Sequence, residues 1–214
     1  MFVYFDLGNV LLNFDHGLMC RQMANVVRSA GGSVSAEQVK TILFEDRHGR
    51  RALQWRFERG EVSADEFYKE FCAAVATEPD RGQLAGAANR IFSPNVSMRV
   101  VLGSLLAARQ PLGLLSNTNE LHWDYVVRQQ DDRLIPSAFR ALALSFEIQC
   151  MKPEPEIFRQ AASLAGVPPH EIFYVDDIAS HVMAARDVGF DAVQYTTTSQ
   201  FVADLRRRGI GLNY

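Results

Sequence analysis

Four apolar, strand-like runs in this sequence each lead into a polar group. The runs are FVYF before Asp6, LGLL before Ser116, ALALSF shortly before Lys152, and IFYV before Asp176 and Asp177. Short apolar runs that alternate with helical patterns are typical of a parallel sheet covered by helices on both faces. In such sheets, ligands bind outside the carboxyl ends of the strands. We therefore expect these polar groups to face one site in an α/β protein.

A helical segment interrupts this alternation just after the first strand. Its hydrophobic pattern is helical throughout, and Ser35 and Ser63 each begin a Ser-Ala-acidic sequence that is typical of a helix N-terminus. The sequence predicts a Rossmann-like three-layer core with a mostly parallel sheet, formed by residues 1–14 and 96–214, and an inserted all-α helical-bundle cap over residues 15–95. Core helices are expected near 96–109, after 119, near 154–166, near 179–188 and at the end of the chain.

Charge and cysteine content limit the class of protein. The 214 residues carry a formal net charge of -3, which offers no general attraction to nucleic acid or to an anionic membrane. No run approaches the ~20 apolar residues that a membrane span needs, and Asp6 interrupts the first apolar run, so no secretory signal is expected. The 3 cysteines form no CxxC pair, which argues against a disulfide framework or a structural zinc site. We expect a cytoplasmic monomer or homodimer without nucleic-acid or membrane partners.

The polar groups at the strand ends have the chemistry that phosphoryl transfer to a carboxylate needs. Taken singly, each could be an ordinary turn or cap residue. Together, carboxylates such as Asp6 and Asp177 favour a nearby cation when partly buried, and Mg²⁺ typically takes one or two carboxylates, water and phosphate oxygens. The ammonium of Lys152 could balance a carboxylate and a phosphate. The Ser116 hydroxyl and the Asn117 backbone amide could bind another phosphoryl oxygen.

Four sequence stretches resemble the motifs of the haloacid dehalogenase-like (HAD) hydrolase superfamily. They are FDLGNVLLNFD, LLSNTNELHW, MKPEPEIF and YVDDIASHVMAARDVGF, in that order, with a helical insert after the first. The resemblance covers essentially the whole chain. FDLGNV together with WRFERGEVSADEF is most similar to the bacterial branch that includes sugar-1-phosphate phosphatases, such as alpha-D-glucose-1-phosphate phosphatases.

The resemblance implies a phosphatase that hydrolyses a small phosphorylated metabolite, a sugar phosphate such as a sugar 1-phosphate, through an aspartyl-phosphate intermediate. Asp6 would be the nucleophile, which divides one difficult displacement into two easier ones. Mg²⁺ would be held by Asp6, the Gly8 carbonyl and Asp177, with Asp176 as a further or neighbouring ligand. Lys152 would be catalytic because it stabilises the charge that develops in the transition state, and Ser116 would be catalytic because its hydroxyl holds a phosphate oxygen.

Substrate contacts are implied in two regions of the chain. The residues expected at the phosphate are Gly8, Asn9, Ser116, Asn117 and Lys152. In the cap, Arg47 and Trp55 are expected to contact the rest of the substrate, with Trp55 as a surface on which a sugar could stack. Neighbouring polar residues of the cap, Arg56 among them, could bind sugar hydroxyl groups.

One position departs from the usual phosphatase pattern. Most phosphatases of the family carry a second aspartate two residues after the nucleophile as a general acid, whereas this chain has Gly8. General acid-base catalysis commonly contributes about 10²–10⁴-fold, so its loss or relocation should matter. Either a substitute such as Asp15, His16 or His181 takes over, or the substrate has a leaving group that needs little protonation, as an anomeric sugar phosphate has.

The same gap leaves two alternatives open. The 2-haloacid dehalogenases of this superfamily also lack the second aspartate, but they need no metal, and they usually carry a Ser-Asn arrangement where this chain has Asp176 and Asp177. The paired carboxylates therefore favour the phosphatase. The other alternative is a catalytically weak protein that binds phosphate for regulation.

Overall fold

The structure, a computed structural model, describes residues 1–128 and 138–212 and divides into two compact units. The first, called here the core unit, comprises Met1–Asn13, Ser93–Asn117 and Asp131–Tyr214. The second, called the helical unit, comprises Phe14–Phe92 and Thr118–Gln130. Each unit is described by itself.

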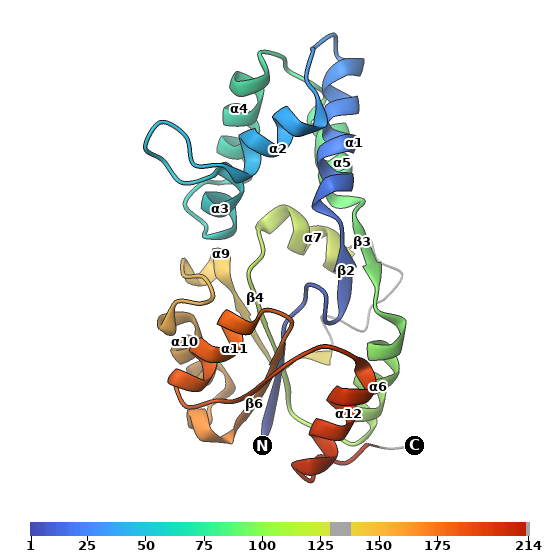
Figure 1. Cartoon of the computed structure of the whole chain (residues 1–214), viewed down its shortest axis with the longest axis vertical. Helices are drawn as coiled ribbons and strands as arrows, with labels where there is room; N and C mark the ends of the chain where they lie inside the picture. Colours follow the sequence, from blue (N-terminus) through green and yellow to red (C-terminus); the bar gives the residue numbers. More distant parts are fainter. Residues whose placement is uncertain (129–137, 213–214) are drawn as a thin grey trace. The chain divides into compact units, whose positions relative to one another are not determined.

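The core unit is built on a five-stranded parallel sheet (Figure 1). Phe5 of the central strand pairs with Leu114 on one side and with Val175 on the other. Because every pair is parallel, the carboxyl ends of all the strands lie at the same edge of the sheet. The predicted α/β fold with a mostly parallel sheet is confirmed. In spatial order, the strands are β5 (Ala141–Leu144), β4 (Leu112–Ser116), β1 (Phe2–Phe5), β6 (Ile172–Asp176) and β7 (Asp191–Gln194).

Helices cover both faces of this sheet, which explains why β1, β4 and β6 are buried along their whole length. Successive side chains of a strand point to opposite faces. Tyr4 and Tyr174 belong to the apolar cluster that includes α10 (Pro155–Ala165) and α11 (Ala179–Asp187). Phe5 and Phe173 contact the Phe201 ring of α12 (Thr198–Arg207), which packs beside α6 (Val96–Ala107).

The helices expected in the core occur close to their predicted positions, as α6, α10, α11 and α12. The expected strand ALALSF is shorter than predicted, because β5 ends at Leu144 and Ser145 begins the short helix α9 (Ser145–Ile148). A 3₁₀ turn, η1 (Pro169–Glu171), leads into β6. No helix within the described ranges is both long and apolar enough to cross a membrane.

The helical unit buries a second apolar cluster, to which most of its helices contribute. Ser35 caps α2 (Ala36–Phe44) and Ser63 caps α4 (Ala64–Val75), as the sequence predicted. At each cap the side-chain and backbone hydrogen bonds are reciprocal. The unit also includes α7 (Glu120–Arg128), which packs on α5 (Arg81–Asn89), whereas the predicted insert ended at residue 95. Strands β2 (Leu12–Phe14) and β3 (Phe92–Pro94), where the chain passes between the units, pair with each other. The helices are α1 (His16–Ser29), α2 (Ala36–Phe44), α3 (Leu53–Glu58), α4 (Ala64–Val75), α5 (Arg81–Asn89) and α7 (Glu120–Arg128).

Candidate active site

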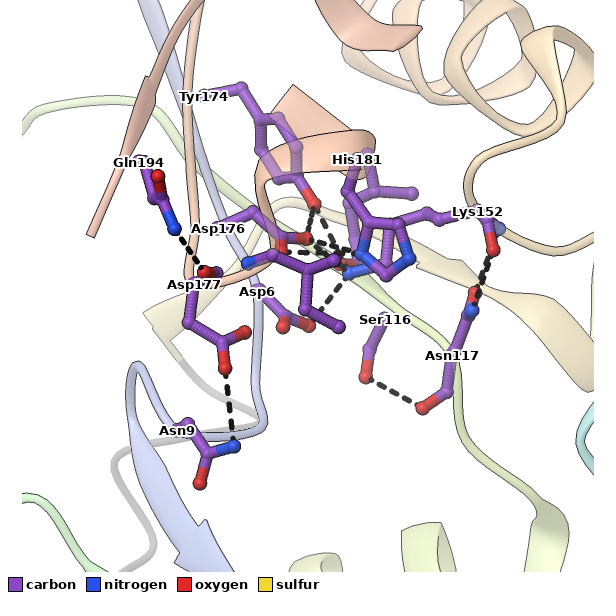
Figure 2. Close-up of polar contacts among 12 residues, drawn as sticks. Asp6, Asn9, Ser116, Asn117, Lys152, Tyr174, Asp176, Asp177, His181 and Gln194 are labelled. Carbon is purple, nitrogen blue, oxygen red and sulfur yellow. Dashed lines mark hydrogen bonds and ion pairs between the residues drawn. The ribbon is translucent and has the colours of Figure 1, made fainter. Parts of the chain in front are cut away.

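Three carboxylates meet at the carboxyl edge of the sheet (Figure 2). Asp6 follows β1 directly, and its backbone N–H donates to the Val175 carbonyl at 2.9 Å, which continues the pairing of β1 with β6 by one residue. Asp176 is the last residue of β6, and Asp177 follows it. Each offers a carboxylate oxygen within 4.8 Å of the others. Parallel strand geometry thus brings together residues that are about 170 positions apart in sequence.

Lys152 supplies a buried cation to this group. It lies in the loop between α9 and α10, and its side chain is 1% exposed. Its Nζ lies 2.8 Å from Asp6 Oδ1 and 2.7 Å from Asp176 Oδ2. The ammonium also donates to the Leu115 carbonyl at 3.2 Å and to the Tyr174 hydroxyl at 3.1 Å. One positive charge is therefore shared between two buried carboxylates.

Asn117 holds the backbone of Lys152 at the end of β4. Its Nδ2 donates to the Lys152 carbonyl at 2.9 Å, and its Oδ1 accepts from the Lys152 N–H at 2.9 Å. The neighbouring Ser116 is buried, and its hydroxyl donates to the Asn117 carbonyl at 3.4 Å. The Asn117 side chain thus fixes the position of Lys152. Any contact between Asn117 and phosphate must therefore come from its backbone amide.

The two oxygens of Asp6 have different surroundings. Oδ1 accepts from the Leu7 N–H at 2.7 Å and lies against the Lys152 ammonium. No hydrogen bond to Oδ2 is found among residues 1–128 and 138–212. Hydrogen bonds thus fix the carboxylate through one oxygen and leave the other for chemistry.

Burial and the shared cation move the pKa values of the group in different directions. Burial raises the pKa of Asp6 to about 7, although Lys152 opposes the shift. Burial also acts to raise the pKa of Asp176, but Lys152 and His181 outweigh it and hold this pKa well below its usual range. Burial acts to lower the pKa of Lys152, and the carboxylates outweigh it and raise the pKa. Lys152 and Asp176 therefore form a charged pair at neutral pH, whereas burial makes Asp6 easier to protonate than an ordinary aspartate.

The charge balance and the ligand chemistry of this group fit a divalent cation. Three carboxylates and one ammonium leave two negative charges in excess when all are ionised. Oxygen ligands of this kind suit Mg²⁺. Asp177 is more exposed than its two partners, and its Oδ2 accepts from Asn9 Nδ2 at 3.2 Å. Asn9 therefore supports Asp177 through its side chain, although the sequence suggested a phosphate contact there. Gly8 lies in the turn after Asp6 and pairs with Leu12 through a single β-bridge.

The helical unit contains a pocket of about 390 Å³ that includes one of the two predicted substrate contacts. Trp55 lines it, and the guanidinium groups of Arg51 and Arg59 lie 5.5 and 5.2 Å from the centre of its ring system. These cations compete with a sugar for the ring faces. Arg47 belongs instead to a turn in which it pairs with Arg50. The residues around the pocket are His16, Phe44, Asp46, Arg51, Ala52, Gln54, Trp55 and Glu58.

Arg56 is committed to an ion pair inside the helical unit. Its Nη1 and Nη2 donate to the two carboxylate oxygens of Glu70 at 2.7 and 3.0 Å. The Arg56 side chain is 14% exposed. This two-pronged contact joins α3 to α4 and indicates a structural role, rather than the sugar contact that the sequence suggested.

The three candidate substitutes for the missing acid have other partners. Asp15 caps α1, where the Leu18 N–H lowers the pKa of its carboxyl group. His16 lies between the rings of Phe14 and Phe44, and burial lowers its pKa. Asp15 is therefore ionised and His16 neutral near pH 7. His181 directs Nδ1 at Asp176, at 3.2 and 3.1 Å from its two oxygens.

Sequence reasoning missed the role of Tyr174. Its hydroxyl donates to Asp176 Oδ2 and accepts from Lys152, although the sequence placed it only within the apolar run IFYV. A signal was present, since Tyr174 precedes Asp176 by two residues and must lie on the same face of β6. The partners of its hydroxyl become apparent only in three dimensions.

Comparison with known proteins agrees with this geometry. A family model described as haloacid dehalogenase-like hydrolase matches residues 2–189. D-ribitol-5-phosphate phosphatase from Bacteroides thetaiotaomicron is 26% identical over 197 residues, which covers 90% of each chain. A predicted HAD-like family hydrolase from Porphyromonas gingivalis has a similar structure, with a TM-score of 0.79, 22% identity and coverage of 98% of this chain and 97% of that one.

A further similar structure is that of a HAD-family enzyme from Bacteroides thetaiotaomicron in complex with magnesium and inorganic phosphate. It has a TM-score of 0.73 and 24% identity, and it covers 91% of this chain and 93% of that one. The narrower likeness to sugar-1-phosphate phosphatases stays a prediction. The match over residues 2–189 confirms the wider resemblance, and the chain belongs to the haloacid dehalogenase-like hydrolases.

Proposed function

We propose that this hydrolase is a Mg²⁺-dependent phosphatase whose substrate is the phosphate ester of a small polyhydroxy compound, a sugar or a sugar alcohol. The observation that carries the proposal is the arrangement around Asp6. Its buried carboxylate shares the Lys152 ammonium with Asp176 and lies beside Asp177. The similarity to a D-ribitol-5-phosphate phosphatase supports this substrate class.

Asp6 acts as the nucleophile in this proposal. Its Oδ2 forms a bond to phosphorus while the bond from phosphorus to the ester oxygen breaks, and water then hydrolyses the aspartyl phosphate to regenerate Asp6. Leu7 N–H and Lys152 hold Oδ1 and so fix the direction of attack. The ammonium offsets negative charge as it builds up on the transferred group. The Ser116 hydroxyl and the Asn117 backbone amide bind phosphate oxygens.

The metal in this proposal would be held by the carboxylates of Asp6 and Asp177 and by the Gly8 carbonyl. When bound, it would supply positive charge that draws the phosphate dianion into a site with excess negative charge. Asp176 contributes indirectly, because its oxygens already accept hydrogen bonds from Lys152, Tyr174, His181 and the Ile178 N–H. Asn9 orients Asp177.

The absence of a side chain at Gly8 bears on which leaving group the substrate carries. Gly8 has no side chain, and the states of Asp15 and His16 do not suit proton donation near pH 7. This favours a substrate whose leaving oxygen needs little protonation, such as a sugar 1-phosphate. The ribitol-phosphate relative points instead to an ester of a primary alcohol. Comparing rates across esters of graded leaving-group pKa separates the two, since an absent acid makes the dependence steep when chemistry limits the rate.

The test is phosphate release from p-nitrophenyl phosphate, glucose 1-phosphate, glucose 6-phosphate and ribitol 5-phosphate, with Mg²⁺ or with EDTA. We expect turnover that needs the metal and is abolished in Asp6→Asn. Asp187→Asn is the matched control, because Asp187 is an exposed residue at the end of α11. Absence of turnover with every ester, together with phosphate binding, would favour a regulatory role. Chloride release from 2-chloropropionate would favour a dehalogenase.

A further inference from the structure

The Asp176 carboxylate is surrounded by hydrogen-bond donors. Oδ2 accepts from Lys152 Nζ at 2.7 Å, from the Tyr174 hydroxyl and from His181 Nδ1 at 3.1 Å. Oδ1 accepts from the Ile178 N–H at 2.8 Å and lies 3.2 Å from His181 Nδ1. Because a carboxylate only accepts, His181 carries its proton on Nδ1 in this contact. The side chain of Asp176 is 0% exposed, so water does not compete for these positions.

Tyr174 connects the carboxylate to the lysine. Its hydroxyl accepts from Lys152 Nζ at 3.1 Å while it donates to Asp176, so Lys152, Tyr174 and Asp176 form a closed triangle of hydrogen bonds (Figure 2). An ammonium has three N–H groups, and this one has acceptors at Asp6, Asp176, Leu115 and Tyr174. The position of the Lys152 ammonium thus depends on how its three N–H groups are divided among these four acceptors.

We propose that Tyr174 and His181 are positioning residues for phosphoryl transfer, which hold Asp176 and, through it, keep the Lys152 ammonium against Asp6. This inference rests on the proposed phosphatase function. Within residues 1–128 and 138–212, neither side chain has a hydrogen bond to Asp6, so each acts through Asp176 and Lys152. The hydrogen bonds from Tyr174 and His181 partly satisfy the Asp176 carboxylate, which weakens its attraction for the Lys152 ammonium.

Loss of these donors has a specific consequence. Without the Tyr174 hydroxyl, Asp176 loses a donor and Lys152 loses an acceptor, so the ammonium shifts toward Asp176 and away from Asp6. Charge stabilisation at the reacting phosphate then weakens, and kcat falls while KM changes little. If the transition state loses the stabilisation of one hydrogen bond to a charged group, kcat falls by about tenfold to a hundredfold.

The chain offers a matched control for the tyrosine. Tyr4 is paired with Tyr174 in the register of β1 and β6, is fully buried, and donates its hydroxyl to the Ala161 carbonyl at 2.7 Å. Tyr174→Phe and Tyr4→Phe each remove one buried hydroxyl from neighbouring strands. A role limited to stability predicts the same kinetic effect for both variants. The proposal predicts that kcat falls only in Tyr174→Phe.

Two substitutions test the hydrogen bond from the His181 imidazole. In His181→Asn an amide N–H can replace the donor at Nδ1, whereas His181→Leu fills space without any donor. We expect kcat to be largely retained in His181→Asn and lost by about tenfold or more in His181→Leu. Equal loss in both variants would overturn the role assigned to the His181 hydrogen bond.

A second measurement separates this inference from the proposed function. The sequence contains only three lysines, Lys40, Lys69 and Lys152, so ¹⁵N NMR can resolve the Lys152 ammonium and follow its hydrogen exchange with water. We expect faster exchange and a shifted signal in Tyr174→Phe, but not in Tyr4→Phe. An unchanged signal with unchanged kcat would overturn the inference. If the wild-type protein releases no phosphate, the proposed function fails, and the NMR comparison alone decides whether Tyr174 holds Lys152.

Discussion

Replacing Lys152 by methionine tests the charge balance of the site directly. The Lys152 side chain is 1% exposed, and its ion pairs with Asp6 and Asp176 measure 2.8 and 2.7 Å. Methionine keeps an unbranched chain but leaves two buried carboxylates without their cation. Breaking a buried ion pair by removing one partner costs about 3–5 kcal/mol. We expect Lys152→Met to lower the free energy of unfolding of the core unit by that amount near pH 8.

The free energy of unfolding that Lys152→Met loses should depend on pH. In the wild type, Lys152 helps to hold the pKa of Asp176 below its unfolded value, so the stability from this pair is present above that value and is lost only at lower pH. In Lys152→Met, burial acts without the cation and raises the pKa of Asp176 and of Asp6. As the pH falls, these two carboxyl groups become protonated, which removes the free-energy cost of burying their unpaired charges in the variant. The loss should therefore be largest near pH 8 and smaller near pH 5.

Urea unfolding followed by circular dichroism at both pH values measures this difference. Lys40→Met is the control, because Lys40 and its partner Glu37 are 59% and 76% exposed at 3.4 Å, and exposed pairs contribute little. A loss below about 1 kcal/mol near pH 8, or an equal loss at both pH values, would contradict the reading of Lys152 as the shared buried cation.

Three further predictions concern the metal, the helical unit and the sheet. Because burial raises the pKa of Asp6 to about 7, protons should compete with Mg²⁺, and the Mg²⁺ concentration for half-maximal activity should rise as the pH falls below about 7; a constant value would contradict this. Arg56→Met should lower the free energy of unfolding by about 0.5–1 kcal/mol in urea titrations without changing kcat/KM for p-nitrophenyl phosphate, because its partner Glu70 is 38% exposed. Gly113→Ala should lose about 1–3 kcal/mol in the same assay, since a Cβ would lie 2.3 Å from the Tyr4 ring, whereas Gly103→Ala, with nothing within 4 Å, should be neutral or stabilising.

Much of the fold could be predicted because sequence position and spatial position are linked in a parallel sheet. Apolar runs of strand length gave β1, β4 and β6, and the polar residues after them had to lie at one edge. For this reason the sequence could place Asp6, Asp176 and Asp177 near one another. The loop that carries Lys152 could be expected there only through the family resemblance, since a loop has no periodic pattern that aims its side chains.

Other features depend on packing that the sequence pattern does not show. Helix α7 has an ordinary amphipathic pattern, and only its contacts with α5 assign it to the helical unit. Tyr174 lies in an apolar strand, where a buried aromatic ring is expected regardless of its hydroxyl. Arg56 faces Glu70 from a neighbouring helix, a pairing that sequence separation does not indicate. In each case a contact between distant segments decides the role.

The amide of Asn117 has a consequence for how freely the chain around the site can vary. A single side chain donates to and accepts from the backbone of Lys152, as a neighbouring strand would, and so extends the edge of β4 past its last residue. The lysine is therefore registered against β4 directly, and the length of chain that separates the two residues does not set its position. Insertions and deletions in that connection can accumulate during evolution while the ammonium stays in place, provided that the amide is retained.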